Sequence, residues 1–282
     1  MRWQDLRRSG NVEDRRGMSG GGKVAIGGLG VVIVVVLGLL TGQDPAQIMD
    51  NLQNSQVTQQ PSNQPAGPRA DDKTADFVSA VLGSTEDVWG QIYKENGAQY
   101  QQPALQIFDN VTQGACGNAS AAMGPFYCPA DEKVYIDLSF CEELRTKFNA
   151  PGDFAVAYVV AHEVGHHVQN LMGITEQVQQ QRRRLSEADY NKLSVKLELQ
   201  ADFLAGVWAN RAHKMDNILE PGDLEAALTA ANAIGDDKLQ KQSQGYVIPD
   251  AFTHGSSAQR MYWFKKGFDT GDLNQGKFND IR

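Results

Sequence analysis

The sequence predicts an α+β fold that is mainly helical, carries a small sheet, and is preceded by one transmembrane helix. Three observations support this prediction. Apolar residues recur at helical spacing over long stretches, two short β-prone runs (ALQIFDNV and KVYIDLSF) are bounded by turn residues, and an uncharged apolar run (VVIVVVLGLL) lies near the N-terminus. With 41% hydrophobic and 21% charged residues, the chain of 282 residues has a globular composition, which excludes a wholly disordered protein.

The apolar run belongs to a longer stretch, residues 24–43, that contains no charged side chain. As a helix rising about 1.5 Å per residue, it spans about 30 Å, the thickness of a bilayer core. A buried core helix and a cleaved signal peptide are the alternatives. A signal peptide usually has a shorter apolar region, and no A-x-A cleavage site follows here. We therefore predict an uncleaved membrane anchor.

Charge predicts the orientation of this anchor. Residues 1–23 hold six basic side chains against three acidic ones, whereas the whole chain has a net charge of −8. The positive-inside rule then places the N-terminus in the cytoplasm, and the domain that follows in the periplasm or outside the cell of a bacterium. The main body carries the negative charge, so we expect no nucleic-acid partner.

Four segments follow from this division. Residues 1–23 form a basic cytoplasmic tail and residues 24–43 the transmembrane helix. Residues 44–75, rich in Gln, Asn, Pro and Asp, form a disordered linker, and residues 76–282 form one folded domain.

Within the domain, one helix and two strands come first, followed by several further helices. The most informative helix begins after Pro151-Gly152, where Asp153 can cap it, and ends at Gly173. In the last helix, Ser256 and Gln259 have the spacing of a capping box. The other expected helices span residues 77–97, 175–185, 187–213 and 223–234.

The helix after Pro151 contains an HExxH motif, formed by His162, Glu163 and His166. Residues at positions i and i+4 share one face of a helix, so both imidazoles can bind one zinc ion while Glu163 addresses a water molecule on it. The adjacent His167 points about 100° away on the helix, so we interpret it as a packing or surface residue. The motif predicts one Zn²⁺ per chain.

A zinc hydrolase needs a third protein ligand. The metzincin pattern is excluded, because Gln169 and Met172 stand where it requires Gly and His. Farther along the chain, Glu198 and Asp202 are again i and i+4, on a largely apolar helix in which carboxylates need partners. A solvated acidic face is the alternative. The spacing resembles the gluzincin pattern, which implies Glu198 as the third ligand and Asp202 as the carboxylate that orients a zinc-bound histidine.

Several segments together resemble a bacterial family of membrane-anchored neutral zinc metallopeptidases. They are RRSGNVEDRRG, GPFYCPADEKVYIDLSF, HEVGHHVQN, ELQADFLAG and FTHGSSAQR, spread over nearly the whole chain. The resemblance implies a zincin-like domain with a gluzincin-like site. Two more roles follow by analogy. A strand containing Tyr135, Ile136 and Asp137 holds an extended substrate, unless it is an interior strand. The loop residue His254 donates to the oxyanion, unless it is only a solvated surface histidine, and Arg260 is the second candidate for this role.

The three cysteines are too few to build a disulfide scaffold. Cys116 and Cys128 are the better pair for one bridge, because the Gly/Ala-rich stretch between them can fold back; free buried thiols are the alternative.

These interpretations combine into one prediction, a membrane-anchored zinc metalloendopeptidase that acts on peptide or protein substrates. Glu163 serves as the general base. A non-catalytic zinc-braced binding or chaperone module is the competitor from another class, and a zinc amidase acting on cell-wall peptides would use the same chemistry.

Overall fold

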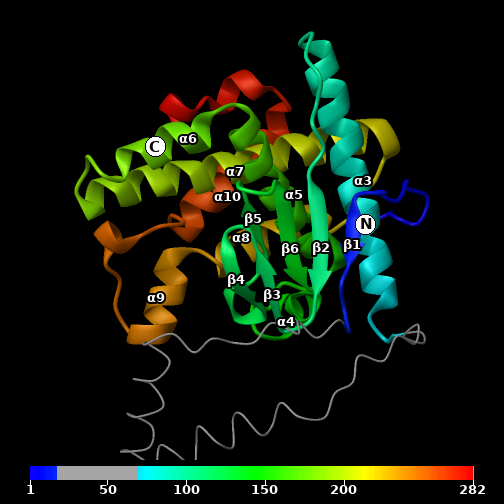
Figure 1. Cartoon of the computed structure of the whole chain (residues 1–282), viewed down its shortest axis with the longest axis horizontal. Helices are drawn as coiled ribbons and strands as arrows, with labels where there is room; N and C mark the ends of the chain where they lie inside the picture. Colours follow the sequence, from blue (N-terminus) through cyan, green and yellow to red (C-terminus); the bar gives the residue numbers. More distant parts are fainter. Residues whose placement is uncertain (18–68, 282) are drawn as a thin grey trace, which may run out of the picture. The chain divides into compact units, whose positions relative to one another are not determined.

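A computed structural model describes residues 1–17 and 69–281 (Figure 1). Residues Met1–Arg16 and Ala70–Arg282 make up one compact unit. The predicted transmembrane helix, residues 24–43, lies outside the described residues, as does the predicted linker up to residue 68. Within the described part of the chain, no helix is both long and apolar enough to cross a membrane.

The unit is mainly helical with small sheets, which agrees with the predicted α+β class. Its described α-helices are α3 (Asp72–Glu95), α4 (Ser139–Thr146), α5 (Asp153–Leu171), α6 (Ile174–Gln181), α7 (Glu187–Asp216), α8 (Asp223–Ala233), α9 (Asp236–Gln244) and α10 (Ser257–Thr270). The predicted linker ends too late, because residues 72–75 already belong to α3. The short helices α4 and α9 were not predicted.

In the described residues, six strands form two sheets. The larger sheet has the order β1-β2-β6-β5, in which β5 runs antiparallel to β6 and the other neighbours are parallel. A separate hairpin pairs β3 with β4. The strands are β1 (Val12–Asp14), β2 (Ala104–Phe108), β3 (Val111–Gly114), β4 (Gly117–Ser120), β5 (Phe126–Cys128) and β6 (Lys133–Asp137). The sheet therefore has β5 at one edge and β1 at the other (Figure 1).

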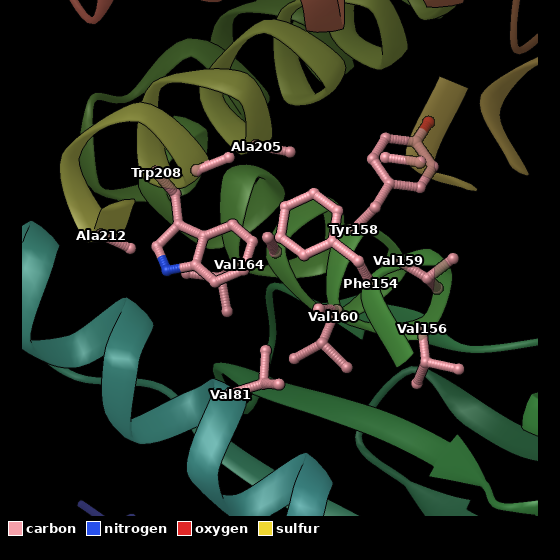
Figure 2. Close-up of a cluster of buried hydrophobic side chains, with 14 of the residues drawn as sticks. Val81, Phe154, Val156, Tyr158, Val159, Val160, Val164, Ala205, Trp208 and Ala212 are labelled. Carbon is pink, nitrogen blue, oxygen red and sulfur yellow. The ribbon is translucent and has the colours of Figure 1, made fainter. Parts of the chain in front are cut away.

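The core lies around α5, whose apolar residues face the sheet, α3 and α7. Phe154 of α5 stacks on Trp208 of α7 at 5.9 Å between ring centroids, and Figure 2 shows Val81 of α3 beside them. Both aromatic side chains are fully buried. Truncation of such a side chain costs about 3–5 kcal/mol, so this cluster fixes the two helices firmly against each other.

Glycines set how closely the helices approach. A Cβ at Gly165 of α5 would lie 3.0 Å from the carbonyl oxygen of Ala201 in α7. At the crossing of α7 and α10, Cβ atoms at Gly206 and Gly267 would lie 2.1 and 2.0 Å from carbonyl oxygens of the partner helix. The three helices α5, α7 and α10 therefore meet at backbone contact.

Two helix starts were predicted, with different outcomes. Ser256 and Gln259 form the predicted capping box of α10. Asp153 does not cap α5, however, because Gly152 holds that position with φ of 109°. The Asp153 carboxylate accepts a hydrogen bond from Trp3 Nε1 at 3.0 Å instead.

Residues 1–16 are not a separate tail. They belong to the same compact unit as α3–α10 and contribute β1 to the sheet, in register with Leu105–Ile107 of β2. The sequence analysis instead placed them in a cytoplasmic tail that ends at residue 23. A strand of three residues is too short to stand out by periodicity, and its basic neighbours are typical of a cytoplasmic flank.

Candidate metal centre

Three candidate ligands from two helices meet at the contact between α5 and α7. The donor atoms of His162, His166 and Glu198 all lie within 4.8 Å of one another. Glu198 Oε2 is 3.2 Å from His162 Nε2, and Glu198 Oε1 is 3.4 Å from His166 Nε2. Gly165 lies between the two histidines in the sequence, and its lack of a side chain lets α7 come this close.

These donors suit zinc, which binds imidazole nitrogen and carboxylate oxygen. Burial would raise the pKa of Glu198, but the two histidines outweigh it and hold the pKa well below its usual range. The third ligand is therefore a carboxylate anion, the form that binds metal. Within residues 1–17 and 69–281, the cluster contains these three candidate ligands and no fourth His, Cys, Asp or Glu. A closed structural zinc site usually has four protein ligands.

Asp202 orients the first histidine. It lies one helical turn beyond Glu198 on α7, is fully buried, and its Oδ1 is 2.9 Å from His162 Nδ1. Burial would raise the pKa of Asp202, but Arg260 and His162 lower it, so the carboxylate is ionised. An ionised Asp202 accepts a hydrogen bond from the Nδ1–H group of His162, which leaves the Nε2 lone pair of His162 free to bind a metal ion.

Gln169 orients the second histidine, a role that the sequence analysis missed. Its Oε1 lies 2.8 Å from His166 Nδ1, while its Nε2 donates to the Leu197 carbonyl at 2.7 Å and to Gln200 Oε1 at 3.1 Å. The amide thus links α5 to α7 beside Glu198. The spacing of three residues after His166 was a usable signal, because it places Gln169 on the same helix face.

Glu163 follows His162 and lines the cavity beside the cluster. It is 7% exposed, and burial raises the pKa of its carboxyl group. A carboxylate with a raised pKa accepts a proton more readily, which is the property that a general base needs.

A cavity of about 610 Å³ opens over the cluster. Its wall includes residues 121–125, which connect β4 to β5, residues 126 and 127 of β5 itself, and side chains of α4, α5 and α7. The lining is largely apolar around a few polar groups, as in small-molecule and peptide sites. Met123 at the rim is 64% exposed.

The strand predicted to hold the substrate lies inside the sheet, the alternative that the sequence analysis left open. Tyr135, Ile136 and Asp137 lie on β6, an interior strand between β2 and β5, and all three are buried outside the cavity wall. The edge strand is β5, and its Phe126 and Tyr127 do line the cavity. The segment KVYID has a clearer β-strand pattern than β5, but the sequence does not show which of the two strands lies at the edge of the sheet.

His254 also lines the cavity, from the loop before α10. The buried Asp236 carboxylate holds this loop, because it accepts hydrogen bonds from the backbone N–H groups of Thr253, His254 and Gly255 at 2.6–3.0 Å. It also lies 3.2 Å from His254 Nδ1. This hydrogen bond raises the pKa of His254 despite partial burial.

Cys116 and Cys128 form a disulfide, the pairing that the sequence favoured. The bridge closes the segment that contains β4 and cavity residues 121–127, so it ties one wall of the cavity to the sheet. Cys141 is a free thiol, and burial raises its pKa to about 12.

His167 is not a ligand, as predicted. It is fully buried between α5 and the sheet, where its Nδ1 lies 2.9 Å from the Tyr127 hydroxyl and its Nε2 lies 2.7 Å from the Gln101 carbonyl oxygen. Burial lowers the pKa of His167, so the imidazole is neutral. It attaches β5 to the helix that carries the candidate ligands.

Comparisons with known proteins agree with this donor set. The chain is 49% identical to the uncharacterized protein YpfJ of Escherichia coli K12 over 281 residues, which cover 98% of this chain and 97% of that protein. It is 41% identical to the uncharacterized protein Rv2575 of Mycobacterium tuberculosis H37Rv over 208 residues, covering 70% and 69%. No solved structure shows significant similarity. A family described as "putative neutral zinc metallopeptidase" matches residues 1–278, and the chain belongs to this family.

Proposed function

We propose that the protein is a zinc-dependent metalloendopeptidase. The observation that carries the proposal is the convergence of His162, His166 and Glu198 at the base of the cavity, with Glu163 beside them. Three protein ligands leave one position of a tetrahedral zinc ion open, which favours a hydrolase over a non-catalytic zinc-braced module.

Each residue of the site has a separate role in the proposed hydrolysis of a peptide bond. When bound, zinc lowers the pKa of a water molecule and polarises the scissile carbonyl group. Glu163 takes a proton from the attacking water and delivers it to the leaving amine. His254, which also lines the cavity, donates a hydrogen bond to the oxygen that becomes negatively charged.

Substrate binding is proposed for β5 in place of β6. Among the described strands, β5 pairs on one side only, with β6, and it borders the cavity. An extended peptide adding to its outer edge would run past Glu163 and the zinc ligands. The aromatic ring of Phe126 stacks on Tyr135 at 4.9 Å, so interior residues of β6 support the strand that the substrate contacts.

The cellular location is proposed on different grounds. The apolar residues 24–43 supply attachment to the bacterial cell membrane. The disulfide between Cys116 and Cys128 suits an oxidising compartment, so the domain lies in the periplasm or outside the cell.

A peptide library tests the function. The full chain, with stoichiometric zinc shown by elemental analysis, is incubated with diverse peptides before and after treatment with a chelator. Cleavage that stops with the chelator and returns with added zinc supports the proposal. Zinc binding without any cleavage would favour the non-catalytic module, and no stoichiometric metal would reject both. Products cut only at cell-wall peptide bonds would identify an amidase.

A further inference from the structure

We propose that Arg260 is a positioning residue for the candidate zinc site, acting through Asp202. Its guanidinium group is 3% exposed and grips the carboxylate with two hydrogen bonds, from Nε to Oδ2 at 2.9 Å and from Nη2 to Oδ1 at 3.0 Å. Asp202 in turn lies 2.9 Å from His162 Nδ1. The inference rests on the proposed zinc site and names a residue that supports it.

The contacts of Arg260 argue against a direct role at the oxyanion. Besides Asp202, its Nη2 donates to the Tyr158 hydroxyl at 3.3 Å, and its Nη1 donates to the Ile234 carbonyl at 3.4 Å. Each nitrogen of the fork therefore already has a protein acceptor. A bidentate arginine fixes both the position and the plane of a carboxylate, which a single ammonium group cannot do. Arg260 thus holds Asp202 in the plane that His162 requires.

Chemical rescue tests this role. In Arg260→Ala, we expect the zinc dissociation constant to rise roughly tenfold, the lower end of the effect of outer-shell losses. Because Arg260 borders the cavity, added guanidinium ion can enter the vacated space and restore the zinc affinity and the cobalt(II) absorption spectrum. Ammonium ion is the matched control cation, and we expect it to restore neither the zinc affinity nor the cobalt(II) spectrum. Arg211→Ala is the protein control, because Arg211 lies on α7, the helix that carries Asp202, but contacts Glu95 and the end of α10.

A folded Arg260→Ala with wild-type zinc affinity and cobalt spectrum would overturn the inference, as would equal rescue by ammonium. If that variant does not fold, Arg260→Lys provides the same test, since it keeps the charge and loses the fork. Wild-type protein that binds no zinc would instead reject the proposed function.

A second inference rests on separate observations at the N-terminus. We infer that residues 1–16 and residues 70–281 fold on the same side of the membrane. The first evidence is the sheet, in which Leu105 N donates to the Asn11 carbonyl and Arg15 N donates to the Ile107 carbonyl, both at 2.9 Å. These bonds make β1 an integral strand beside the interior strand β2.

A buried carboxylate supplies the stronger evidence. Glu86 of α3 is 1% exposed, and three side chains of the N-terminal segment donate hydrogen bonds to its carboxylate. They are Ser9 Oγ at 2.6 Å, Asn11 Nδ2 at 2.7 Å and Arg7 Nη2 at 2.8 Å. Glu86 is therefore both covered and paired by the N-terminal segment. An unpaired buried charge is strongly destabilising, so these donors account for a carboxylate at this position of α3.

The packing of α3 leads to the same conclusion. A Cβ at Gly83 would lie 2.3 Å from the Arg7 carbonyl oxygen, so the helix surface is shaped to receive the segment. The Trp3 ring is 4% exposed and packs edge-to-face on Phe77 at 5.2 Å. A chain that crosses the membrane once between residues 16 and 70 could not make these contacts. They conflict with a cytoplasmic N-terminus joined to an exported domain.

Cysteine labelling in cells tests the inference. Gly10 and Lys241 are exposed, and a Cβ at Gly10 meets no atom within 4 Å. Gly10→Cys and Lys241→Cys are made singly in the full chain carrying Cys141→Ala, and cells are treated with a membrane-impermeant maleimide before and after permeabilisation of the cell membrane. We expect both cysteines to react in the same condition. Labelling of one in intact cells while the other requires permeabilisation would overturn the inference.

Discussion

Glu163 is the side chain on which the proposed chemistry depends most directly. It lines a largely apolar cavity, and burial raises the pKa of its carboxyl group. The two candidate histidine ligands, His162 and His166, lie on the same helix. A carboxylate in this setting is costly to keep without a function, because burial favours its neutral form. Its position therefore argues for a proton-transfer role over a structural one.

We predict that Glu163→Gln keeps stoichiometric zinc and wild-type stability while kcat falls by a factor of about 10²–10⁴, the usual contribution of a general base. The amide has the shape of the carboxyl group but cannot accept the proton. Zinc content, thermal unfolding and peptide turnover are measured together, with Glu176→Gln on the exposed part of α6 as the matched control. Turnover within tenfold of wild type would remove Glu163 from the mechanism.

His254 gives a prediction with a pH dependence. Asp236 faces Nδ1, so Nε2 carries a proton only in the imidazolium form, and that form is needed for donation from Nε2 to the oxyanion. Asp236 raises the pKa of His254, with Glu198 adding to the rise and Arg260 opposing it. Activity should therefore fall as pH increases through this raised pKa, because the donor is lost on the alkaline side.

We predict that His254→Ala lowers kcat by roughly 10²–10³ with unchanged zinc content. Asp236→Asn, which removes the charge that raises the pKa, should move the alkaline limb of the kcat–pH profile to lower pH. Identical profiles for wild type and Asp236→Asn would show that His254 does not act in this form. Loss of metal from His254→Ala would mean that the residue is a ligand.

The residues that the sequence predicted are those whose geometry is local. His162, Glu163 and His166 follow from spacing on one helix, and the E-x-x-x-D pattern of Glu198 and Asp202 is equally local. Arg260 lies 58 positions from Asp202, so only the packing of α10 on α7 reveals the pair. Gln169 was noticed merely as a departure from another ligand pattern, because its acceptors on α7 are long-range contacts.

At the scale of elements, the disulfide-closed segment determines the shape of the cavity. Cys116 and Cys128 are separated by 12 positions, and residues 121–127 between them form one wall. In the chain-entropy description, closing a loop of this length contributes about 3 kcal/mol. The bridge should therefore keep the wall in place while the metal ligands are held independently by α5 and α7.

We predict that the double variant Cys116→Ser/Cys128→Ser raises KM for peptides more than it lowers kcat, and leaves zinc affinity within about twofold of wild type. The loosened wall must be ordered again when substrate binds, which weakens binding. Cys141→Ala, which removes the free thiol, is the control. An unchanged KM would show that the segment is rigid without the bridge, and loss of zinc would show that it supports the metal cluster.

The longer elements were predictable, and several of the shortest were not. The helices α5, α7 and α8 match the predicted ranges to within three residues, and α10 begins at the predicted Ser256, because each repeats an apolar face over several turns. Strands β1 and β5, with three residues each, give no usable periodicity. The role of Tyr135 was misassigned for this reason, since β6 becomes an interior strand only because β5 pairs beside it.

At the scale of the molecule, the N-terminal segment completes the fold. It contributes an edge strand to the sheet and pairs the buried charge of α3, and Trp3 reaches the first residue of the helix that carries the candidate ligands. Charge alone suggested a cytoplasmic basic tail, because residues 1–23 hold six basic side chains against three acidic ones. Two of these basic side chains, Arg7 and Arg8, pair with Asp87 and Asp76 of α3, more than 60 positions away in the sequence.

The stability of the domain should therefore depend on Trp3. In Trp3→Ala, the packing against Phe77 and the hydrogen bond to Asp153 are both lost, and we expect the free energy of unfolding to fall by about 3–5 kcal/mol, as for other buried tryptophans. Urea unfolding of the full chain measures the change. Tyr262→Ala is the matched control, because this ring is 58% exposed and its loss should cost no more than about 0.5 kcal/mol.

Because Asp153 begins α5, the destabilised protein should also lose zinc at a lower urea concentration than wild type. Equal stability of Trp3→Ala and Tyr262→Ala would mean that residues 1–16 are an accessory to a domain that folds without them.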